Sequence, residues 1–286
     1  MNQPFRFHVG AFECMLMLDG ALAHHAPQPQ FMFANAPAAE AQQSLQAYTA
    51  APAHAEHNLS AYFGLLINTG RQLVLVDTGA GHLVPDTGQL IANLRVAGIA
   101  PEEIDTVILT HAHLDHIGGI VDESGKPAFP KAHYVMTKRD YLFWTQAPDL
   151  SWMPFPSALI ELFRTFVAQK LVPLQPDLIE DEVEIAPGIQ TLAAPGHTPG
   201  HIALNITSAG EQLLYLVDTV LHPIHVEHPE WYAAVDQNSA QTVATRKRLF
   251  ERAAQDQARV LVFHFPFPGL GHITHRGAGW HWQTLD

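Results

Sequence analysis

The chain has 286 residues, of which 47% are hydrophobic and 15% charged, a composition that supplies a sizeable core and excludes wholesale disorder. It carries 15 Lys and Arg against 28 Asp and Glu, a formal charge of −13 that disfavours nucleic acid and membrane surfaces as partners. The single cysteine, Cys14, excludes an internal disulfide framework and a Cys-rich zinc site. The 19 histidines outnumber Lys and Arg together, and several are closely spaced.

Nothing in the sequence indicates export or a membrane anchor. No apolar run approaches the ~18–20 residues that a bilayer requires, and residues 1–10 lack a basic stretch followed by an apolar one. We therefore expect a soluble, cytoplasmic protein.

Strand and helix patterns alternate along the chain. A strand or hairpin is predicted over 5–20, and residues 21–60, rich in Ala, Pro, Gln and His, are predicted to form an irregular arm or cap. Further strands are predicted at 105–110, 133–137 and 259–264, and helices at 86–98, 138–146, 157–170 (with Ser157 as a candidate N-cap) and 239–257. The alternation indicates an α/β fold with helices outside packed sheets, and we expect a single domain over 1–286.

Two segments resemble each other. Residues 62–79 and 201–219 each consist of an apolar strand, a polar turn with Gly, then Gln-Leu and a second apolar strand that ends in Val-Asp-Thr. Hairpins with a buried second strand explain this pattern. Their similar places in the two halves of the chain predict an internal duplication.

A run of metal-binding residue types follows the predicted strand at 105–110. His111 and His113 point to the same side of an extended strand end because side chains alternate with a period of two. Asp115 and His116 follow as the chain turns, so four side chains able to bind a metal fall within six residues. Neutral imidazole and carboxylate suit zinc and related divalent metals. The run therefore predicts a metal site.

Further ligand candidates lie downstream: His197 in the Pro/Gly-constrained loop 194–201, Asp218 at the end of the second hairpin, and His264 at the end of strand 259–264. Ligands from several strand ends that meet at one sheet edge are typical of α/β sites. Taken alone, Asp218 also fits a turn residue and His264 a core histidine. Together with the histidine-rich run, they predict a site with enough ligands for more than one metal.

The motif His-x-His-x-Asp-His at 111–116, preceded by Val-Asp-Thr-Gly at 76–79, resembles the metallo-β-lactamase superfamily. The loop Pro-Gly-His-Thr-Pro-Gly-His, the strand-end Asp218 and the late His264 follow in the matching order, so the resemblance covers roughly residues 60–275. It implies a four-layer αβ/βα sandwich built from two related halves, in agreement with the duplication.

The same resemblance implies two divalent metals per chain, zinc first, with manganese, iron or cobalt as alternatives. The implied ligands form two groups that share a bridging carboxylate: His111, His113 and His197 for one metal, Asp115, His116 and His264 for the other, and Asp218 between them with a water or hydroxide. Asp77 is implied to orient a ligand loop through hydrogen bonds rather than to bind metal.

Such a pair of ions lowers the pKa of a bridging water towards ~7 and polarises the acyl or phosphoryl oxygen of a substrate. Asp115 and Asp218 are the candidate catalytic residues, Asp115 because a ligand carboxylate keeps a free oxygen that can steer the hydroxide or shuttle its proton. Redox members of the superfamily carry glutamate at the position of His113, so hydrolysis is expected here.

The C-terminal run 263–272 resembles the branch of the superfamily that contains methyl parathion hydrolase, lactonases and aryl esterases. Its Phe and Pro residues predict an apolar pocket for an acyl or aromatic group, although core packing explains them equally well. Acyl homoserine lactonases of the superfamily commonly place a tyrosine three residues after the bridging aspartate, where this chain has Leu221. The candidate pocket residues are therefore Leu221 itself, Phe267, and His222, Tyr232 and His272 as replacements for that tyrosine.

We thus expect a dinuclear metal hydrolase of lactones or carboxylic and aryl esters, with phosphotriester hydrolysis as a side activity. A thioesterase of the glyoxalase II kind and a metal-stabilised binding protein without activity are the alternatives. The lack of a basic cluster disfavours the first, and the complete ligand set disfavours the second. The arm, with Phe31, Phe33, Tyr48 and the adjacent Tyr62, is expected to supply substrate walls or a homodimer contact.

Overall fold

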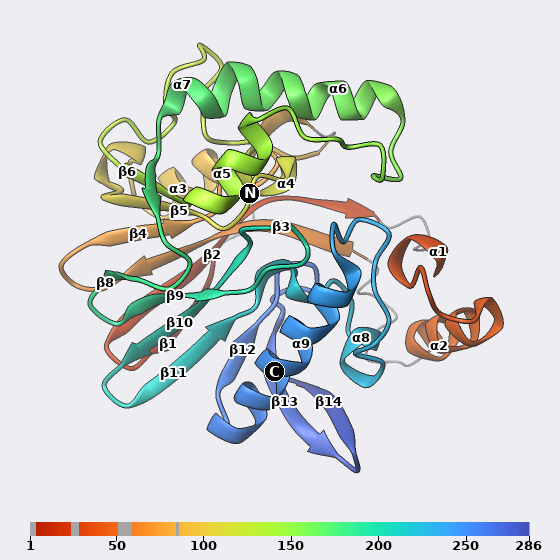
Figure 1. Ribbon diagram of the computed structural model, residues 1–286. Helices are drawn as coiled ribbons and strands as arrows, with labels where there is room; N and C mark the ends of the chain where they lie inside the picture. Colours follow the sequence, from red (N-terminus) through yellow and green to blue (C-terminus); the bar gives the residue numbers. More distant parts are fainter. Residues whose placement is uncertain (1–3, 24–28, 51–58, 84–85, 286) are drawn as a thin grey trace.

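The computed structural model describes residues 4–23, 29–50, 59–83 and 86–285. Two seven-stranded mixed sheets dominate the fold (Figure 1). The first has the order β1-β2-β3-β4-β5-β6-β7, with bounds Phe5–Val9, Phe12–Ala23, Leu59–Asn68, Leu73–Val76, Thr106–Leu109, His133–Thr137 and Asp177–Ile179. The second has the order β14-β13-β12-β11-β10-β9-β8, where β8 to β14 are Glu184–Ala186, Ile189–Ala193, Ile202–Ser208, Glu211–Tyr215, Arg259–Leu261, Leu270–Arg276 and Gly279–Thr284.

Nine α-helices accompany the sheets in the described part of the chain: α1 Pro29–Met32, α2 Ala38–Ala50, α3 Leu90–Val96, α4 Leu114–Ile117, α5 Lys138–Thr145, α6 Ser157–Phe166, α7 Val172–Leu174, α8 Ile224–Glu227 and α9 Ser239–Asp256. Helices α3 to α7 cover the outer face of the first sheet and α9 the outer face of the second (Figure 1). None of the described helices is long and apolar enough to cross a membrane.

The core is arranged in layers that follow from the alternation of apolar side chains on each strand. One buried cluster lies between the sheets and includes Phe63 and Val76 from the first and Ile202 and Tyr215 from the second. A second cluster joins the first sheet to its helices, and a third joins the second sheet to α9. Helix, sheet, sheet and helix therefore form the predicted four-layer αβ/βα sandwich.

The two halves have corresponding connections, as the sequence repeat predicts. The hairpin β3–β4 is followed by α3 and by β5, which pairs parallel to β4. The hairpin β10–β11 is followed by α9 and by β12, which pairs parallel to β11. The backbone N–H of Asp77 donates to the carbonyl of Ile108, and that of Leu216 donates to Leu261 in the same way. Asp218 therefore lies two positions beyond the structural counterpart of Asp77, although the Val-Asp-Thr repeat aligns the two residues.

Most predicted elements are present, with shifted ends. The helix predicted from residue 86 begins at Leu90, because Asp86 and Gly88 have positive φ angles of 65° and 85° that a right-handed helix does not accommodate. Pro156, not Ser157, is the N-cap residue of α6, and Ser157 is its first helical residue. Strand β12 ends at Leu261, so His264 lies in the loop that follows.

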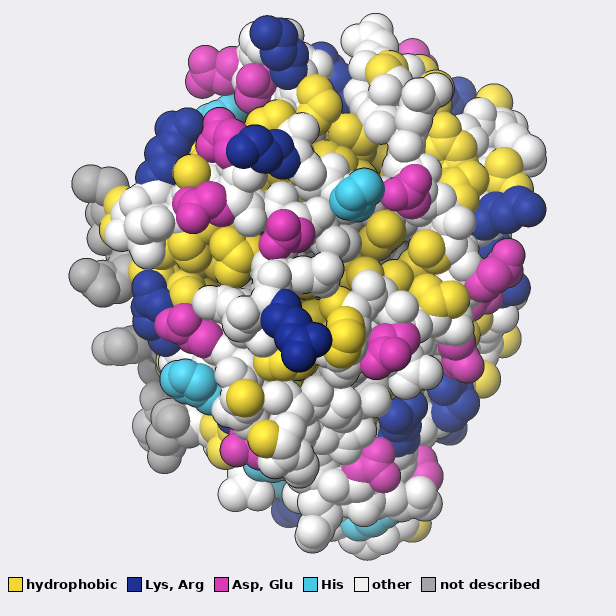
Figure 2. Space-filling view, turned by 90° about the vertical axis from the view of Figure 1, so that its left-hand side faces the viewer, with side chains coloured by type: hydrophobic (Ala, Val, Ile, Leu, Met, Phe, Trp, Pro, Cys, Tyr) yellow, Lys and Arg dark blue, Asp and Glu magenta, His cyan; other side chains and the backbone are white. Residues whose placement is uncertain are grey.

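Part of the predicted arm forms regular secondary structure. Its two ends belong to β2 and β3, and α1 and α2 lie between them; residues 24–28 and 51–58 of the arm lie outside the described residues. Figure 2 shows acidic and basic side chains interspersed over one face of the molecule, with hydrophobic side chains between them.

Candidate metal centre

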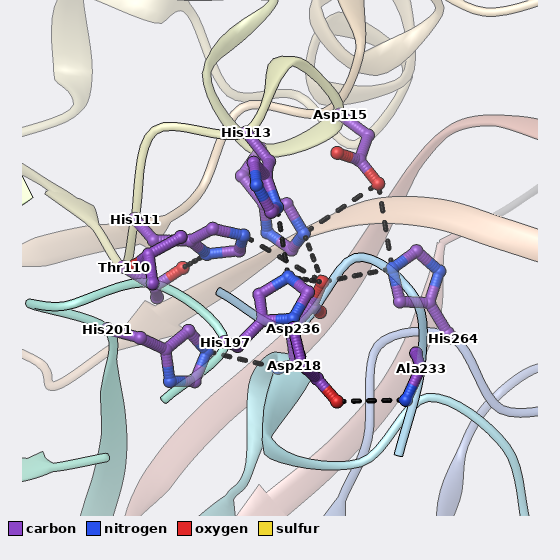
Figure 3. Close-up of polar contacts among 12 residues, drawn as sticks. Thr110, His111, His113, Asp115, His197, His201, Asp218, Ala233, Asp236 and His264 are labelled. Atoms are coloured by element: carbon purple, nitrogen blue, oxygen red, sulfur yellow. Dashed lines mark hydrogen bonds and ion pairs between the residues drawn. The ribbon is translucent and has the colours of Figure 1, made fainter. Parts of the chain in front are cut away.

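The seven predicted ligands lie close together. Figure 3 labels all of them except His116. Each comes from a segment at the end of a strand or between strands. The loop after β5 contributes His111 and His113, and α4 contributes Asp115 and His116. The other three follow β9, β11 and β12 respectively: His197, Asp218 and His264. Their candidate ligand atoms form two groups, each with all atoms within 4.8 Å of one another: His111, His113, His197 and Asp218, and Asp115, His116 and His264.

Asp218 lies between the two groups. Its Oδ2 atom is 3.3 Å from His197 Nε2 and 3.8 Å from His111 Nε2 in the first group. The same oxygen is 3.3 Å from His116 Nε2 and 3.1 Å from His264 Nε2 in the second. Its backbone position follows Val217, a β-branched residue with a φ of 49°, a strained conformation that fixes the turn after β11. One carboxylate thus faces ligands of both groups.

The donor set fits divalent metals. The side chains of His111, His116, His113 and Asp218 are buried, with at most 6% of their surface exposed. Yet His111 Nε2, His116 Nε2 and Asp218 Oδ1 have no hydrogen-bond partner in the described part of the chain. Buried polar atoms without partners are costly, and imidazole nitrogen and carboxylate oxygen are ligands that zinc and similar ions favour. Metal coordination would satisfy these atoms.

Asp77 contacts His116 of the second group on the ring nitrogen that faces away from Asp218. Its Oδ2 atom lies 2.8 Å from His116 Nδ1 and accepts a hydrogen bond from the Thr110 hydroxyl at 2.8 Å, while its Oδ1 accepts from the Thr110 backbone N–H at 2.9 Å. Asp77 has a φ of 59°, which is uncommon for a residue other than glycine. The Asp77 carboxylate therefore directs His116 Nε2 towards Asp218, in keeping with the orienting role expected for it.

His201 supports Asp218. Its Nδ1 atom is 3.0 Å from the carbonyl oxygen of Ala194, and its Nε2 accepts the backbone N–H of Asp218 at 3.2 Å. This pattern assigns the proton to Nδ1 and leaves the ring neutral. Burial lowers the pKa of His201 to about 3, so the neutral ring persists at working pH.

Asp140, on α5, connects the two loops that carry His111, His113 and His197. Its Oδ2 accepts the backbone N–H of Ala112 at 2.9 Å, and its Oδ1 accepts the hydroxyl of Thr198 and the N–H of Gly200. A Cβ atom on Gly200 would lie 2.2 Å from the Asp140 nitrogen, so only glycine allows this approach. The carboxylate is fully buried, and burial raises its pKa to about 6.

Asp236 and Arg246 form a fourth support, behind His197. Asp236 Oδ1 lies 2.9 Å from His197 Nδ1, and its Oδ2 accepts the backbone N–H of Ala233. The Arg246 side chain is fully buried, 3.9 Å from Asp236, and donates to the carbonyl oxygens of Thr219, Pro229 and Trp231. Burial lowers the pKa of Arg246 to about 10, so its charge is retained at neutral pH.

The candidate ligand histidines differ in the direction in which their surroundings shift their pKa values. Burial lowers the pKa of His111 and His113 well below its usual value. Burial also opposes a charge on His197, but hydrogen bonds to Asp218 and Asp236 outweigh it and raise its pKa to about 9. For His116, burial is likewise outweighed by the carboxylates of Asp218, Asp115 and Asp77, which hold its pKa well above the usual value.

A cavity of about 400 Å³ opens onto both groups. Its polar walls are His113, Asp115, His197, Asp218 and His264, together with Tyr62. The remaining lining residues are apolar: Phe31, Met32, Leu83, Leu114, Phe155, Leu159, Leu162, Phe163, Leu221 and Val235. Burial raises the pKa of the Tyr62 phenol, and the charges of Asp115 and Asp218 raise it further, so this hydroxyl stays protonated.

Of the five predicted pocket residues, Leu221 lines the cavity and four are placed elsewhere. Phe267 packs against Phe5 and Phe63 in the core between the sheets. His272 lies on β13, where its Nδ1 atom is 3.0 Å from the carbonyl oxygen of Ala258. The apolar run 263–272 therefore serves packing rather than the pocket, apart from His264.

The other two predicted pocket residues lie behind the cavity wall. The His222 ring packs against Phe33 and Tyr48, with ring centroids 5.6 and 4.8 Å away. Tyr232 lies beside the arm, where its backbone N–H donates to Asn35. His222 packs against residues of the arm and Tyr232 is hydrogen-bonded to it, and neither lines the cavity.

The arm supplies part of the cavity wall, as expected. Phe31 lines the cavity and contacts Phe155 at a centroid distance of 6.0 Å. Phe33 is buried against Trp231 and His225, and His225 Nε2 lies 2.9 Å from the carbonyl oxygen of Met32. These aromatic side chains are thus engaged within their own chain.

Comparison with known proteins identifies the family. A family model described as the metallo-β-lactamase superfamily matches residues 62–264, which include all seven candidate ligands. This chain belongs to the metallo-β-lactamase superfamily. Like its relatives in that superfamily, it is a metal-dependent hydrolase.

Several superfamily members are similar over much of their length. An N-acyl homoserine lactonase of a Bacillus species is 25% identical over 221 residues, which cover 70% of this chain and 79% of the relative. The structure of AidC, a dizinc quorum-quenching lactonase in complex with its product, is 27% identical with a TM-score of 0.87, covering 99% of this chain and 98% of AidC. The hydrolase AbOPH, 24% identical with a TM-score of 0.85 over 100% of this chain and 98% of its own, shares the fold.

Sequence reasoning named the seven candidate ligands but missed four residues that support them: Asp140, His201, Asp236 and Arg246. Thr137 is the N-cap residue of α5, and its side chain accepts the backbone N–H of Asp140. In the sequence, Thr-x-x-Asp is therefore read as an ordinary helix start, which hides the role of Asp140. Asp236 and Arg246 are ordinary charged residues in the sequence. Only the complete burial of Arg246, within a helix whose other charged residues are exposed or half-buried, marks it as part of the centre.

Proposed function

We propose that this protein hydrolyses lactones, and carboxylic or aryl esters, whose acyl group is apolar. The observation that carries the proposal is the cavity: its apolar walls from the arm and α6 lead directly to the clustered ligands. Cavities of this kind bind the apolar part of a small substrate and place its polar group at the few polar side chains present. The similarity to acyl homoserine lactonases supports lactones as the first class to test.

We assign two zinc ions to the centre. The first would be held by His111, His113 and His197, the second by Asp115, His116 and His264, and Asp218 would bridge them; the position of the Asp218 carboxylate between the two groups supports this division. When bound, such a pair supplies hydroxide at neutral pH and polarises the acyl oxygen of the substrate.

Side chains of the protein itself then transfer the proton and exclude water. Asp115 lines the cavity, and the exposed fraction of its side chain, 25%, is larger than the 2% of Asp218. Its carboxylate is therefore the one placed to accept a proton and return it to the departing oxygen of the substrate. The apolar walls exclude water from the acyl group, which strengthens each polar contact there.

The residues that line the cavity also distinguish between the alternative substrate classes. No Lys or Arg occurs among the described residues that line it, so an anionic thioester of the glyoxalase II kind has no cationic partner. Aryl phosphotriesters such as methyl parathion carry no charge and fit the same apolar walls, and we place them as a side activity.

Turnover on a matched panel tests the proposal: a γ-lactone with and without an acylamino chain, dihydrocoumarin, p-nitrophenyl acetate, methyl parathion and a glutathione thioester. Each substrate is measured with the isolated protein, after chelation, and after return of zinc, with metal content determined in parallel. We expect lactones and esters to be turned over with about two metals per chain. Turnover of the thioester alone would refute the proposal.

A homodimer that uses the outer surface of the arm stays a prediction. Sedimentation at micromolar concentration checks it, and a monomer would remove it.

A further inference from the structure

We infer that Tyr62 is a substrate-binding catalytic residue, whose hydroxyl donates a hydrogen bond to the acyl oxygen of the substrate as negative charge develops there. The inference rests on the proposed ester or lactone hydrolysis and adds a residue to it. Its starting point is the chemistry of the cavity wall.

Among the described residues that line the cavity, Tyr62 is the one side chain with a polar group outside the candidate ligand set. Five of the lining residues are candidate ligands, and the others apart from Tyr62 have only hydrocarbon or thioether side chains. A substrate in this cavity therefore meets one neutral hydrogen-bond donor beyond the metal centre. In a small apolar cavity, a single donor decides how the polar end of the ligand is oriented.

The hydroxyl of Tyr62 is available for this contact. Only 8% of the residue is exposed, and its hydroxyl makes no hydrogen bond within the described part of the chain. The hydroxyl is not among the fully enclosed polar atoms without a partner, so it is open to a ligand in the cavity that Tyr62 lines. The fully enclosed hydroxyl of Tyr215 also lacks a partner, but Tyr215 packs between the sheets and does not line the cavity.

The ring of Tyr62 packs against two consecutive residues of the loop after β12. It stacks on Phe263, with centroids 5.8 Å apart and planes at 27°, and it meets the edge of the His264 ring at 6.0 Å. Its backbone lies within β3, paired with Gly20 of β2. A donor fixed in this way needs no reorganisation during the reaction, which is the condition under which such groups stabilise a developing oxyanion.

The position of Tyr62 matches the proposed contact. Tyr62 lines the same cavity as Asp115 and Asp218, and its ring meets that of the candidate ligand His264, so it lies beside the place where the acyl group must react. A tyrosine hydroxyl is a neutral donor near pH 7. The proton stays on Tyr62 throughout, so no bond of this residue is made or broken.

The test compares Tyr62→Phe with Tyr215→Phe. Each variant removes one hydroxyl that lacks a partner, and each keeps its ring and its packing. We expect Y62F to lower kcat/KM on the order of 10²-fold, mostly through kcat, as removal of one oxyanion donor does. Y215F should stay within twofold of the unaltered protein. Metal content and melting temperature should be unchanged in both.

A binding measurement adds a readout that does not depend on turnover. The open-chain product of an acylated γ-lactone keeps the former acyl carbon as a carboxylate, and calorimetry should show weaker binding of this product to Y62F. Equal kcat/KM and equal affinity in Y62F and the unaltered protein would overturn the inference, and so would loss of metal from Y62F.

The two proposals fail separately. If the unaltered protein hydrolyses esters but no lactone, the preference for lactones fails and the Y62F comparison is made on the ester. If lactones are turned over and Y62F is as active as the unaltered protein, the proposed function stands and the role of Tyr62 is wrong.

Discussion

His113 and His197 come from opposite halves of the sandwich, yet His113 Nδ1 and His197 Nε2 lie 2.9 Å apart. Without a metal, two imidazole nitrogens at this distance must share a proton, because two facing lone pairs repel each other. With a metal, both lone pairs are engaged. Proton release should therefore accompany metal binding.

The first prediction, proton release on metal binding, follows from the raised pKa values of two histidines. His197, with a pKa of about 9 against an ordinary 6.5, and His116, also raised, carry protons at pH 7 in the metal-free protein. Zinc must displace them, so its apparent affinity should increase as the pH rises towards about 9. The stabilisation that protonated His197 gives the metal-free fold has the opposite sign: it is complete below about 6.5 and is lost as the pH rises through about 9.

Calorimetric titration of zinc into chelator-treated protein, in two buffers of different ionisation enthalpy, measures the protons released. We expect between one and two per chain at pH 7, roughly as the two raised histidines require. A binding enthalpy that is the same in both buffers would contradict the prediction.

The second prediction concerns Asp140. Asp140→Asn replaces one acceptor oxygen by a donor, and either orientation of the amide places N–H groups against the N–H or O–H donors of the loops that carry His111, His113 and His197. We expect about 10- to 100-fold weaker metal binding or turnover, the usual effect of losing a group that orients ligands. Asp149→Asn is the control, because that exposed aspartate caps only its own turn. Metal analysis after equilibration with limiting zinc decides the outcome, and D140N that matches D149N would refute it.

The third prediction concerns the free energy of unfolding. Arg246→Met leaves the buried Asp236 carboxylate and three carbonyl oxygens without their cationic partner, and breaking a buried pair in this way costs about 3–5 kcal/mol. Arg252→Met, in the same helix, removes an exposed pair with Asp256 and should cost about 0.5 kcal/mol. Urea unfolding of both variants gives the comparison. A similar loss in the two would mean that the buried arginine adds nothing beyond helix packing.

The fourth prediction concerns the length of the acyl chain. Each methylene that enters the apolar cavity contributes about 0.8 kcal/mol, so kcat/KM should rise about fourfold per methylene until the cavity is full. Phe31→Ala removes one wall and should reduce this gain for the longer chains, whereas Val172→Ala changes an exposed side chain outside the cavity. Kinetics on an acyl series measure the effect; a series independent of length would place the acyl chain outside the cavity.

The clustering of the candidate ligands was predictable because these residues are close in sequence or lie at the ends of recognisable strands. A short strand followed by His111, His113, Asp115 and His116 leaves few alternatives once the α/β pattern is recognised. The cavity was less predictable. Phe267 and Phe163 are both aromatic residues in apolar runs, but one packs between the sheets and the other lines the cavity, and only the docking of the layers decides which.

The repeat shows a further limit of sequence comparison. Matching Val-Asp-Thr segments predicts the duplicated hairpins correctly. It also aligns Asp77 with Asp218, which the hydrogen bonds of their sheets place two positions apart. One supports His116 from behind and the other lies among the ligands, because the extra residues carry the chain further past the strand end in the second half.

The packing of the arm has a consequence for the order in which the protein is assembled during synthesis. The hydrogen bond from His225 to Met32 joins positions 193 residues apart, and Phe33 rests on Trp231. Since the chain emerges from the ribosome N-terminus first, these aromatic residues are made early and find their partners late. The wall of the cavity that is translated first is thus completed after most of the chain, and until then Phe33 lacks the partner that buries it.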